Sequence, residues 1–198
     1  IKRIIVSTYQ AASGAGKDGL DELERQIKEA AAGKEMTAHI FPSASAAKHF
    51  PLALNLVPQI DVFLDNLYTK EEMKMVNETK KIMEDYEMRI TATTIRVPVY
   101  RSHSESVNIE LEKEVDLGAM REALAKFPGV TVQDDPSKQE YPMPLYTSEK
   151  DDVYVGRLRR DESCEKSYNI WVVGDQIRKG AALNTLQIAE TMIKNGWI

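Results

Sequence analysis

A histidine surrounded by charged residues is the most suggestive chemical feature of this sequence. His103 lies between Arg101 and Glu105, with Arg96 shortly before it, in a chain with only three histidines. Imidazole exchanges protons near neutral pH and neighbouring charges tune it, so this stretch could supply a general acid or base. Arg96 and His103 are seven residues apart, which places them on opposite faces of a regular strand. They can share a site only if the backbone bends, and we expect that bend at Pro98.

A nucleophile to work with this histidine is harder to find. The only cysteine, Cys164, lies in a charged, acidic segment that would stabilise a thiolate poorly. Ser102 and Ser104 adjoin His103 but lack the glycine-flanked turn of a nucleophilic serine. No glycine-rich dinucleotide fingerprint follows any predicted strand. The sequence therefore offers an acid or base and anion-binding groups without a nucleophile or a cofactor fold.

A glycine-rich segment at residues 11–17 follows the first predicted strand. A phosphate-binding loop has the pattern GxxxxGK[ST], whereas Ala11 here replaces the first glycine and Asp18 replaces the hydroxyl residue. The segment therefore favours a tight strand-to-helix turn. Amides at a helix N-terminus would still suit an anion or the edge of a cofactor.

Hydrophobic periodicity predicts about six strands and four helices. Strands are expected near residues 4–9, 88–100, 107–112, 130–132, 153–158 and 170–173. Helices are expected near residues 20–33, 69–83, 117–127 and 179–195, and the proline-bearing segments 33–66 and 134–148 should be irregular. The strands mostly follow one another, which predicts one α+β domain over residues 1–198, with a mixed, largely antiparallel sheet and helices packed on one face.

The predicted helix at residues 69–83 has two distinct faces. Thr69 and Glu72 form a capping-box pattern. The apolar face consists of Met73, Val76 and Met83. Glu71 and Lys74 lie on the opposite face, which is typical of a solvated surface with weak ion pairs. Alternatively, these two residues line a site for a ligand that has both an amino and an anionic group.

Bulk properties exclude several classes of protein. A net charge of −5 and a pI of about 5.4 argue against nucleic-acid binding, and no apolar run is long enough to span a membrane. One cysteine rules out an internal disulfide framework and fits the cytoplasm. His39 and His49 lack metal-ligand spacing, so we expect structural roles for them and no metal site. The start at Ile1, without a methionine, suggests a fragment or a processed piece.

Five stretches, taken together, resemble aspartate-semialdehyde dehydrogenases. They are VSTYQAASGAG (6–16), PQIDVF (58–63), YTKEEMK (68–74), RVPV with HSE (96–99 and 103–105) and KGAALN (179–184). They occur in the family's order and span almost the whole chain. The resemblance is to the C-terminal catalytic and dimerisation domain, which implies a glyceraldehyde-3-phosphate dehydrogenase-like fold. It also implies that the N-terminal Rossmann-type domain is absent, together with the catalytic cysteine just before Ile1.

Such a resemblance implies a specific reaction. Members of the family use NADPH to reduce aspartyl 4-phosphate to aspartate semialdehyde and phosphate, through a cysteine thioacyl intermediate. The reaction serves lysine, threonine and methionine biosynthesis in the cytoplasm. The resemblance implies a homodimer, with a tetramer as the alternative, and an isolated 198-residue chain without activity.

Roles in catalysis and substrate binding carry over position by position. His103 matches the family's acid/base, and Gln10 matches the glutamine that orients the substrate. Arg96 matches the arginine that binds the substrate α-carboxylate, which suits a bidentate guanidinium. Glu71 matches the carboxylate facing the substrate amino group, and Lys74 matches the lysine at the phosphate site.

Cofactor-binding positions also match, and one position departs from the family pattern. Ser13 and Gly14 match the turn near the nicotinamide, and Asn184 matches a contact to its carboxamide end. The family usually has a cysteine two residues before the substrate-binding arginine, where Thr94 stands here. We expect this substitution to change packing rather than chemistry.

Two alternatives remain. N-acetylglutamyl-phosphate reductases are similar in logic and domain plan, but their acetylated substrate has no ammonium group to pair with Glu71. The missing nucleophile also fits a non-catalytic dimerisation module.

Overall fold

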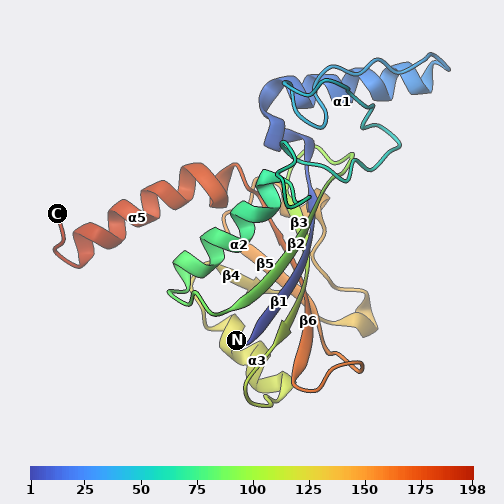
Figure 1. The fold of residues 1–198 in the computed structure, drawn as a ribbon. Helices are drawn as coiled ribbons and strands as arrows, with labels where there is room; N and C mark the ends of the chain where they lie inside the picture. Colours follow the sequence, from blue (N-terminus) through green and yellow to red (C-terminus); the bar gives the residue numbers. More distant parts are fainter.

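The computed structural model describes residues 1–198, which form a single sheet with helices at its face and its ends (Figure 1). The strands are β1 (Arg3–Gln10), β2 (Arg89–Arg96), β3 (His103–Glu110), β4 (Val130–Val132), β5 (Val153–Arg160) and β6 (Ser167–Gly174). The α-helices are α1 (Gly16–Ala31), α2 (Lys70–Ile82), α3 (Leu117–Ala125), α4 (Pro144–Thr147) and α5 (Leu183–Lys194). Short helical turns are η1 (Ala12–Ala15), η2 (Pro136–Lys138) and the π-helical η3 (Arg178–Ala182).

The six strands form a mixed sheet in the order β2-β1-β3-β6-β5-β4. The β1–β2 and β4–β5 pairs are parallel, and the three other pairs are antiparallel. The predicted α+β class with a mixed, largely antiparallel sheet is confirmed. Five α-helices are present where four were predicted, because the proline-bearing segment near residue 144 forms the one-turn helix α4.

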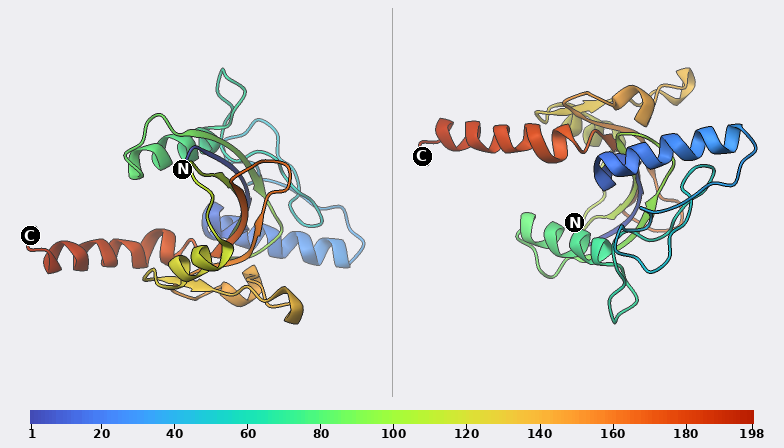
Figure 2. Two further views of the ribbon diagram at one scale, coloured as in Figure 1. Left: turned by 90° about the horizontal axis from the view of Figure 1, so that it is seen from below. Right: turned by 90° about the horizontal axis from the view of Figure 1, so that it is seen from above.

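Helices α2 and α3 cover one face of the sheet. The helix α2 packs on β2, and α3 packs on β4 and β5, both on the concave side (Figure 2). The helix α1 instead lies beyond the end of β1, against residues 33–66 (Figure 1). There Leu23 packs with Phe41 and Leu52 in a small separate core. The side-chain carbonyl of buried Gln26 accepts hydrogen bonds from the amides of Leu52 and Ala53. In this irregular connection a side chain therefore satisfies backbone amides that no helix or strand pairs.

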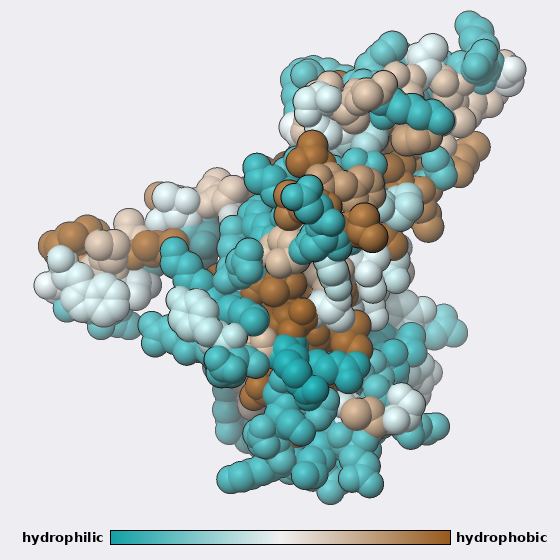
Figure 3. Space-filling model, in the orientation of Figure 1, coloured by the Kyte–Doolittle hydropathy of each residue, from teal (hydrophilic) through white to brown (hydrophobic).

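The apolar faces of α2 and α5 are only partly covered in this chain. Met73 and Val76 of α2 are half-buried, whereas Met83, which follows the helix, is 50% exposed. The most deeply buried residues of this helix are Thr69 and Glu72 at its N-terminal end. On α5, Leu186 and Ile193 are 61% and 65% exposed, because this helix projects away from the sheet (Figures 1 and 3). The capping box of Thr69 and Glu72 is confirmed. None of the helices has the length and apolar character needed to cross a membrane.

Strand limits near the opening histidine also differ from the prediction. The strand expected at residues 88–100 ends at Arg96, and the one expected at 107–112 begins already at His103. Alternation at 103–106 is weak in the sequence because polar residues occupy both faces there. Pairing with β1 and β6 on either side nevertheless makes this segment a strand.

Candidate active site

The ends of β1, β2 and β3 bring three predicted site residues together. In the β1–β2 pair, Gln10 lies opposite Arg96. In the β1–β3 pair, Tyr9 lies opposite Ser104, so Gln10 and His103 end neighbouring strands. Cross-strand partners share a face of the sheet. Gln10, Arg96 and His103 therefore project from the face that α2 covers.

The chain between β2 and β3 makes the bend that this arrangement requires. The Val97 amide donates to the Gln10 carbonyl at 3.0 Å, and the Ala12 amide donates to the Val99 carbonyl at 2.8 Å. Residues 97–100 thus cross the end of β1, from its β2 side to its β3 side. Pro98 cannot donate to a ladder, so it suits the crossing. The predicted bend is confirmed.

Glu71 lies in the first turn of α2 and faces this cluster. Gln10 Nε2 donates to Glu71 Oε1 at 3.3 Å, and Lys74 Nζ lies 3.6 Å from Glu71 Oε2. The side chains of Glu71 and Lys74 are 23% and 54% exposed. The interpretation of this face as fully solvated is therefore wrong for Glu71, while Lys74 stays at the rim. Together with Arg96 they offer a guanidinium, a carboxylate and an ammonium within one small region.

Arg96 is buried with part of its hydrogen-bonding capacity unused. The residue is 4% exposed, and its Nη1 donates to the Ala11 carbonyl at 2.7 Å. Its Nε is buried without any partner. Burial lowers the pKa of Arg96 to about 10, and the negative charge of Glu71 opposes that effect. A buried guanidinium is stable only when anionic or polar partners compensate it, so a bound carboxylate would complete this environment.

His103 has a defined ring orientation. Its Nδ1 accepts a hydrogen bond from the Ala11 amide at 3.1 Å. The accepting nitrogen carries no proton, so the neutral ring carries its proton on Nε2. Burial lowers the pKa of His103 to about 3, with a further lowering by the charge of Arg96 and an opposing effect of Asp175. In this chain His103 is therefore a neutral imidazole at pH 7, with Nε2–H free to donate.

The turn after β1 contacts both charged centres. A Cβ atom on Gly14 would lie 2.5 Å from Arg96 Nη1 and 3.4 Å from His103 Cε1, so a side chain there would displace the Arg96 guanidinium. Ser13 is 7% exposed, and its Oγ accepts a bond from Gln176. Asn184 is exposed on α5, where it lines a hollow with other residues of that helix and the C-terminus. The structure thus gathers every predicted site residue except Asn184.

Sequence reasoning missed two residues that surround His103. Asp175 is completely buried, accepts the amides of Glu149, Ile177 and Arg178, and pairs with Arg101 Nη2 at 2.8 Å. Gln176, the next residue, bonds to Ser13 and Ser102. An aspartate directly after a predicted strand is an available turn signal. Nothing local reveals the long-range partners of Gln176.

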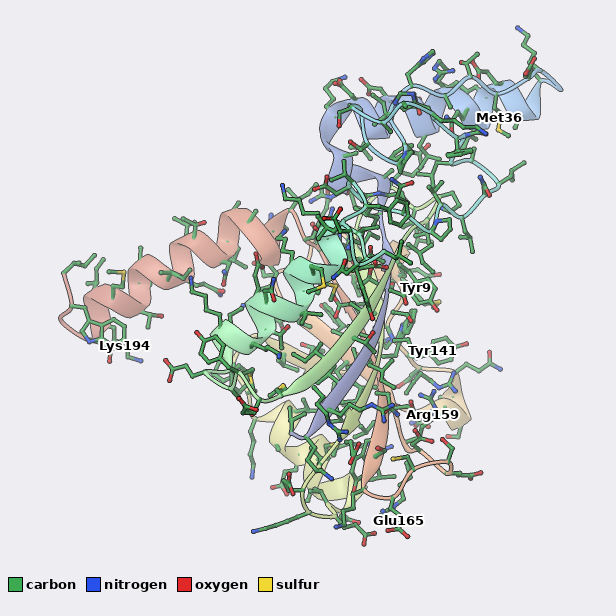
Figure 4. All side chains as sticks on the ribbon, in the orientation of Figure 1. Tyr9, Met36, Tyr141, Arg159, Glu165 and Lys194 are labelled. Atoms are coloured by element: carbon green, nitrogen blue, oxygen red, sulfur yellow. The ribbon has the colours of Figure 1, made fainter.

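Two further positions behave as the sequence predicts. Thr94 is completely buried, and its Oγ1 lies 3.4 Å from Thr69 Oγ1, which is a packing role. Cys164 lies in the β5–β6 connection, beside Glu165 (Figure 4). That connection is at the Ser167 end of β6, whereas His103 pairs with Gly174 at the other end, roughly 20–25 Å away. Cys164 cannot reach His103.

Comparisons with known proteins agree with this geometry. Residues 1–179 match the family model described as semialdehyde dehydrogenase, dimerisation domain. An aspartate-semialdehyde dehydrogenase from Aquifex aeolicus is 48% identical over 100% of this chain and 56% of its own length. Aspartate semialdehyde dehydrogenase II from Vibrio cholerae, solved in a complex with ASA, is 40% identical over 98% of this chain and 55% of its own, with a TM-score of 0.89.

A more distant structure has the same fold. The aspartate semialdehyde dehydrogenase from Candida albicans, solved with NADP, is 22% identical over 100% of this chain and 52% of its own, with a TM-score of 0.67. The chain described here spans about half the length of the relatives it matches.

Proposed function

Because this chain belongs to the semialdehyde dehydrogenase dimerisation-domain family, we propose that it is the substrate-binding and dimerisation domain of an aspartate-semialdehyde dehydrogenase. The whole enzyme would reduce aspartyl 4-phosphate to aspartate semialdehyde and phosphate. The observation that carries this proposal is the buried, incompletely bonded Arg96 beside the carboxylate of Glu71. Such a pair suits a substrate that presents both an α-carboxylate and an α-ammonium group.

Each of the gathered residues has a proposed task in substrate binding. The guanidinium of Arg96 binds the α-carboxylate, and Glu71 binds the ammonium group. Gln10, which is hydrogen-bonded to Glu71, orients both the carboxylate of Glu71 and the substrate. Lys74 is half-exposed at the rim, where a phosphate group can leave to solvent.

His103 is proposed to hold or move a proton at Nε2. In this chain the neutral ring can donate Nε2–H to an oxygen or sulfur atom of the reacting group. A cysteine thiolate beside Nε2 would raise the pKa of His103, because a nearby anion favours the imidazolium. A protonated ring can give the Nε2 proton to the tetrahedral intermediate. The ring is then neutral with its proton on Nδ1, so this step requires the Ala11 amide to release Nδ1. No residue near His103 in this chain can act as the nucleophile, so we propose that a second, nucleotide-binding domain supplies the cysteine.

Ser13, Gly14 and Asn184 are proposed to face the cofactor, which we propose to be NADP. The residues fit such a role, because glycine at position 14 leaves no side chain between the turn and His103, and because Asn184 is exposed. The bound cofactor would supply the hydride. The turn would hold the nicotinamide end close to the acid/base, while the rest of the cofactor binds to the second domain.

The face of the sheet turned away from α2 and α3 is the proposed homodimer contact. Tyr9, Tyr141 and Arg159 lie along the side turned away from α2 (Figure 4), and the Tyr9 ring lies 5.6 Å from that of Trp171. A half-buried aromatic surface of this kind favours association with a second copy.

Turnover by the full-length protein that contains this chain tests the proposed function. With NADP and phosphate, it should oxidise aspartate semialdehyde at least about 100-fold more efficiently than N-acetylglutamate semialdehyde, because the latter offers Glu71 no ammonium group. The 198-residue chain alone is the control and should show no turnover. Preference for the acetylated substrate would favour the reductase alternative, and no turnover of either would favour the non-catalytic module.

A further inference from the structure

The carboxylate of Glu72 bonds the start of α2 to the strand that carries Arg96. Its Oε2 accepts a hydrogen bond from the Thr69 amide at 2.7 Å, which completes the capping box. Its Oε1 accepts a hydrogen bond from the Thr94 amide of β2 at 3.1 Å. Glu72 is only 9% exposed, and both threonines are completely buried. One buried carboxylate thus joins the N-terminal end of a helix to a strand.

The bond to Thr94 occupies a position that a neighbouring strand would otherwise fill. The strand β2 lies at the edge of the sheet. On that edge Thr94 donates to Glu72, and the Arg96 amide donates to the Val57 carbonyl at 2.9 Å. Capping of α2 requires only the bond to Thr69, so the bond to Thr94 serves to place the helix on β2 and to satisfy a buried amide.

This contact lies between the two groups that are proposed to bind the substrate. Glu71 directly precedes Glu72, and Arg96 follows Thr94 by two residues on β2. Residues two apart on a strand share a face, so Thr94 and Arg96 both project from the face that α2 covers. The distance between the Glu71 carboxylate and the Arg96 guanidinium therefore depends on how α2 is placed against β2. A second link, from Gln10 Nε2 to Glu71 Oε1, is longer at 3.3 Å and therefore weaker.

We propose that Glu72 is a positioning residue that sets the distance between Glu71 and Arg96, and that it thereby makes the site selective for substrates with an amino group next to the carboxylate. A carboxylate and a guanidinium at a fixed distance bind such a pair of groups together, whereas a displaced Glu71 leaves only the guanidinium contact. This inference rests on the proposed function, because it assumes that Arg96 and Glu71 bind the substrate. Glu72 itself is bonded to Thr69 and Thr94 and acts only through Glu71.

Glu72→Gln in the full-length protein separates the two bonds of this side chain. Glutamine still completes a capping box, but its NH₂ group cannot accept a bond from the Thr94 amide. The start of the helix is therefore retained while the link to β2 is lost. Glu78→Gln is the matched control, because it removes the same charge from an exposed position of the same helix. Asn77→Gly, also at an exposed position, is a second control that lowers the stability of α2 without changing either bond of Glu72.

Kinetics with two aldehydes measure the effect on selectivity. Aspartate semialdehyde carries the amino group, and succinate semialdehyde is the same molecule without it. At saturating NADP and phosphate, Glu72→Gln should lower kcat/KM for aspartate semialdehyde roughly tenfold, because a binding group is displaced. Succinate semialdehyde offers no group to Glu71, so its kcat/KM, or its inhibition constant if it is not turned over, should change less than about threefold. Both control variants should leave the ratio of the two values within about twofold of wild type.

A crystal structure of full-length Glu72→Gln gives a readout that does not need turnover. We expect the first turn of α2 to shift away from β2 and the bond from Gln10 to Glu71 to be lost. An unchanged first turn would overturn the proposal. So would an equal loss for both aldehydes, or a control variant that changes the ratio as much as Glu72→Gln does.

Thermal unfolding of Glu72→Gln shows whether the carboxylate is needed for the fold as a whole. Loss of the folded state would overturn the proposal, because Glu72 would then have a general structural role. If the wild-type enzyme uses neither aldehyde, the proposed function fails. The crystal structure then still decides whether Glu72 places Glu71.

Discussion

Replacing Arg96 by lysine tests the proposed recognition of the substrate carboxylate. Lysine keeps the positive charge but loses the planar pair of donors that can bind two carboxylate oxygens. In this structure Nη1 is already committed to the Ala11 carbonyl, while Nε is buried and free. The substrate bond at risk is therefore the one that the guanidinium makes in addition to its bond to Ala11, because a lysine ammonium cannot make both in the same geometry.

The size of the effect follows from the loss of one hydrogen bond to the substrate. Losing one charge-assisted hydrogen bond in a buried site costs roughly 1.5–3 kcal/mol. That free energy corresponds to a loss of about 10- to 150-fold in kcat/KM at 25 °C. Because the bond to the α-carboxylate is present in both ground and transition states, KM should carry most of the loss.

Steady-state kinetics of the full-length enzyme with aspartate semialdehyde would measure this effect. The matched control is Arg89→Lys at the other end of the same strand, where the arginine is exposed and pairs with Glu110. That change should leave kcat/KM within about twofold, since exposed ion pairs contribute little. The assignment of Arg96 would be refuted by Arg96→Lys kinetics that match those of Arg89→Lys.

Three further predictions concern His103 and Gly14. In the full-length enzyme, His103→Ala should lower kcat roughly 10²- to 10⁴-fold while KM stays within a few-fold, and wild-type kcat would remove His103 from the chemistry. Gly14→Ala should lower kcat/KM by about tenfold or more, because its Cβ would collide with Arg96 Nη1 at 2.5 Å; unchanged kinetics would contradict that contact. Burial lowers the pKa of His103 to about 3, so the unfolded chain binds its proton first as pH falls below about 6.5. Between pH 7 and pH 5 the free energy of unfolding should therefore fall by up to about 2 kcal/mol more in the wild type than in His103→Gln. Urea titrations at several pH values would measure this difference. If the free energy of unfolding of both proteins changes equally with pH, the ring is not buried in its neutral form.

Local signals in the sequence account for most of the secondary structure. Apolar patterning places four of the six strands to within three residues at each end, and the Thr69–Glu72 capping box marks the start of α2. The entry to β3 at His103 escaped prediction because its strand character comes from pairing on both sides rather than from its own residues. The apolar residues Leu186 and Ile193 of α5 are mostly exposed, because this helix projects away from the sheet.

The residues of the candidate site also differ in how far the sequence alone reveals them. His103 stands out by residue type alone, and Arg96 follows once a bend at Pro98 is assumed. Gln10 and Asn184 have no local signal, and only the family resemblance points to them. The contacts of Ala11, Asp175 and Gln176 with distant segments depend on the assembled topology. Sequence pattern cannot reveal such contacts, because backbone amides and carbonyls are present at almost every position.

The central claim is that Arg96 and Glu71 together hold the substrate beside His103. A crystal structure of the full-length protein with aspartate semialdehyde tests it most directly. We predict the substrate carboxylate at roughly 2.7–2.9 Å from the Arg96 guanidinium and its ammonium group on Glu71. A substrate bound with its carboxylate away from Arg96, or with Glu71 facing solvent, would contradict the account.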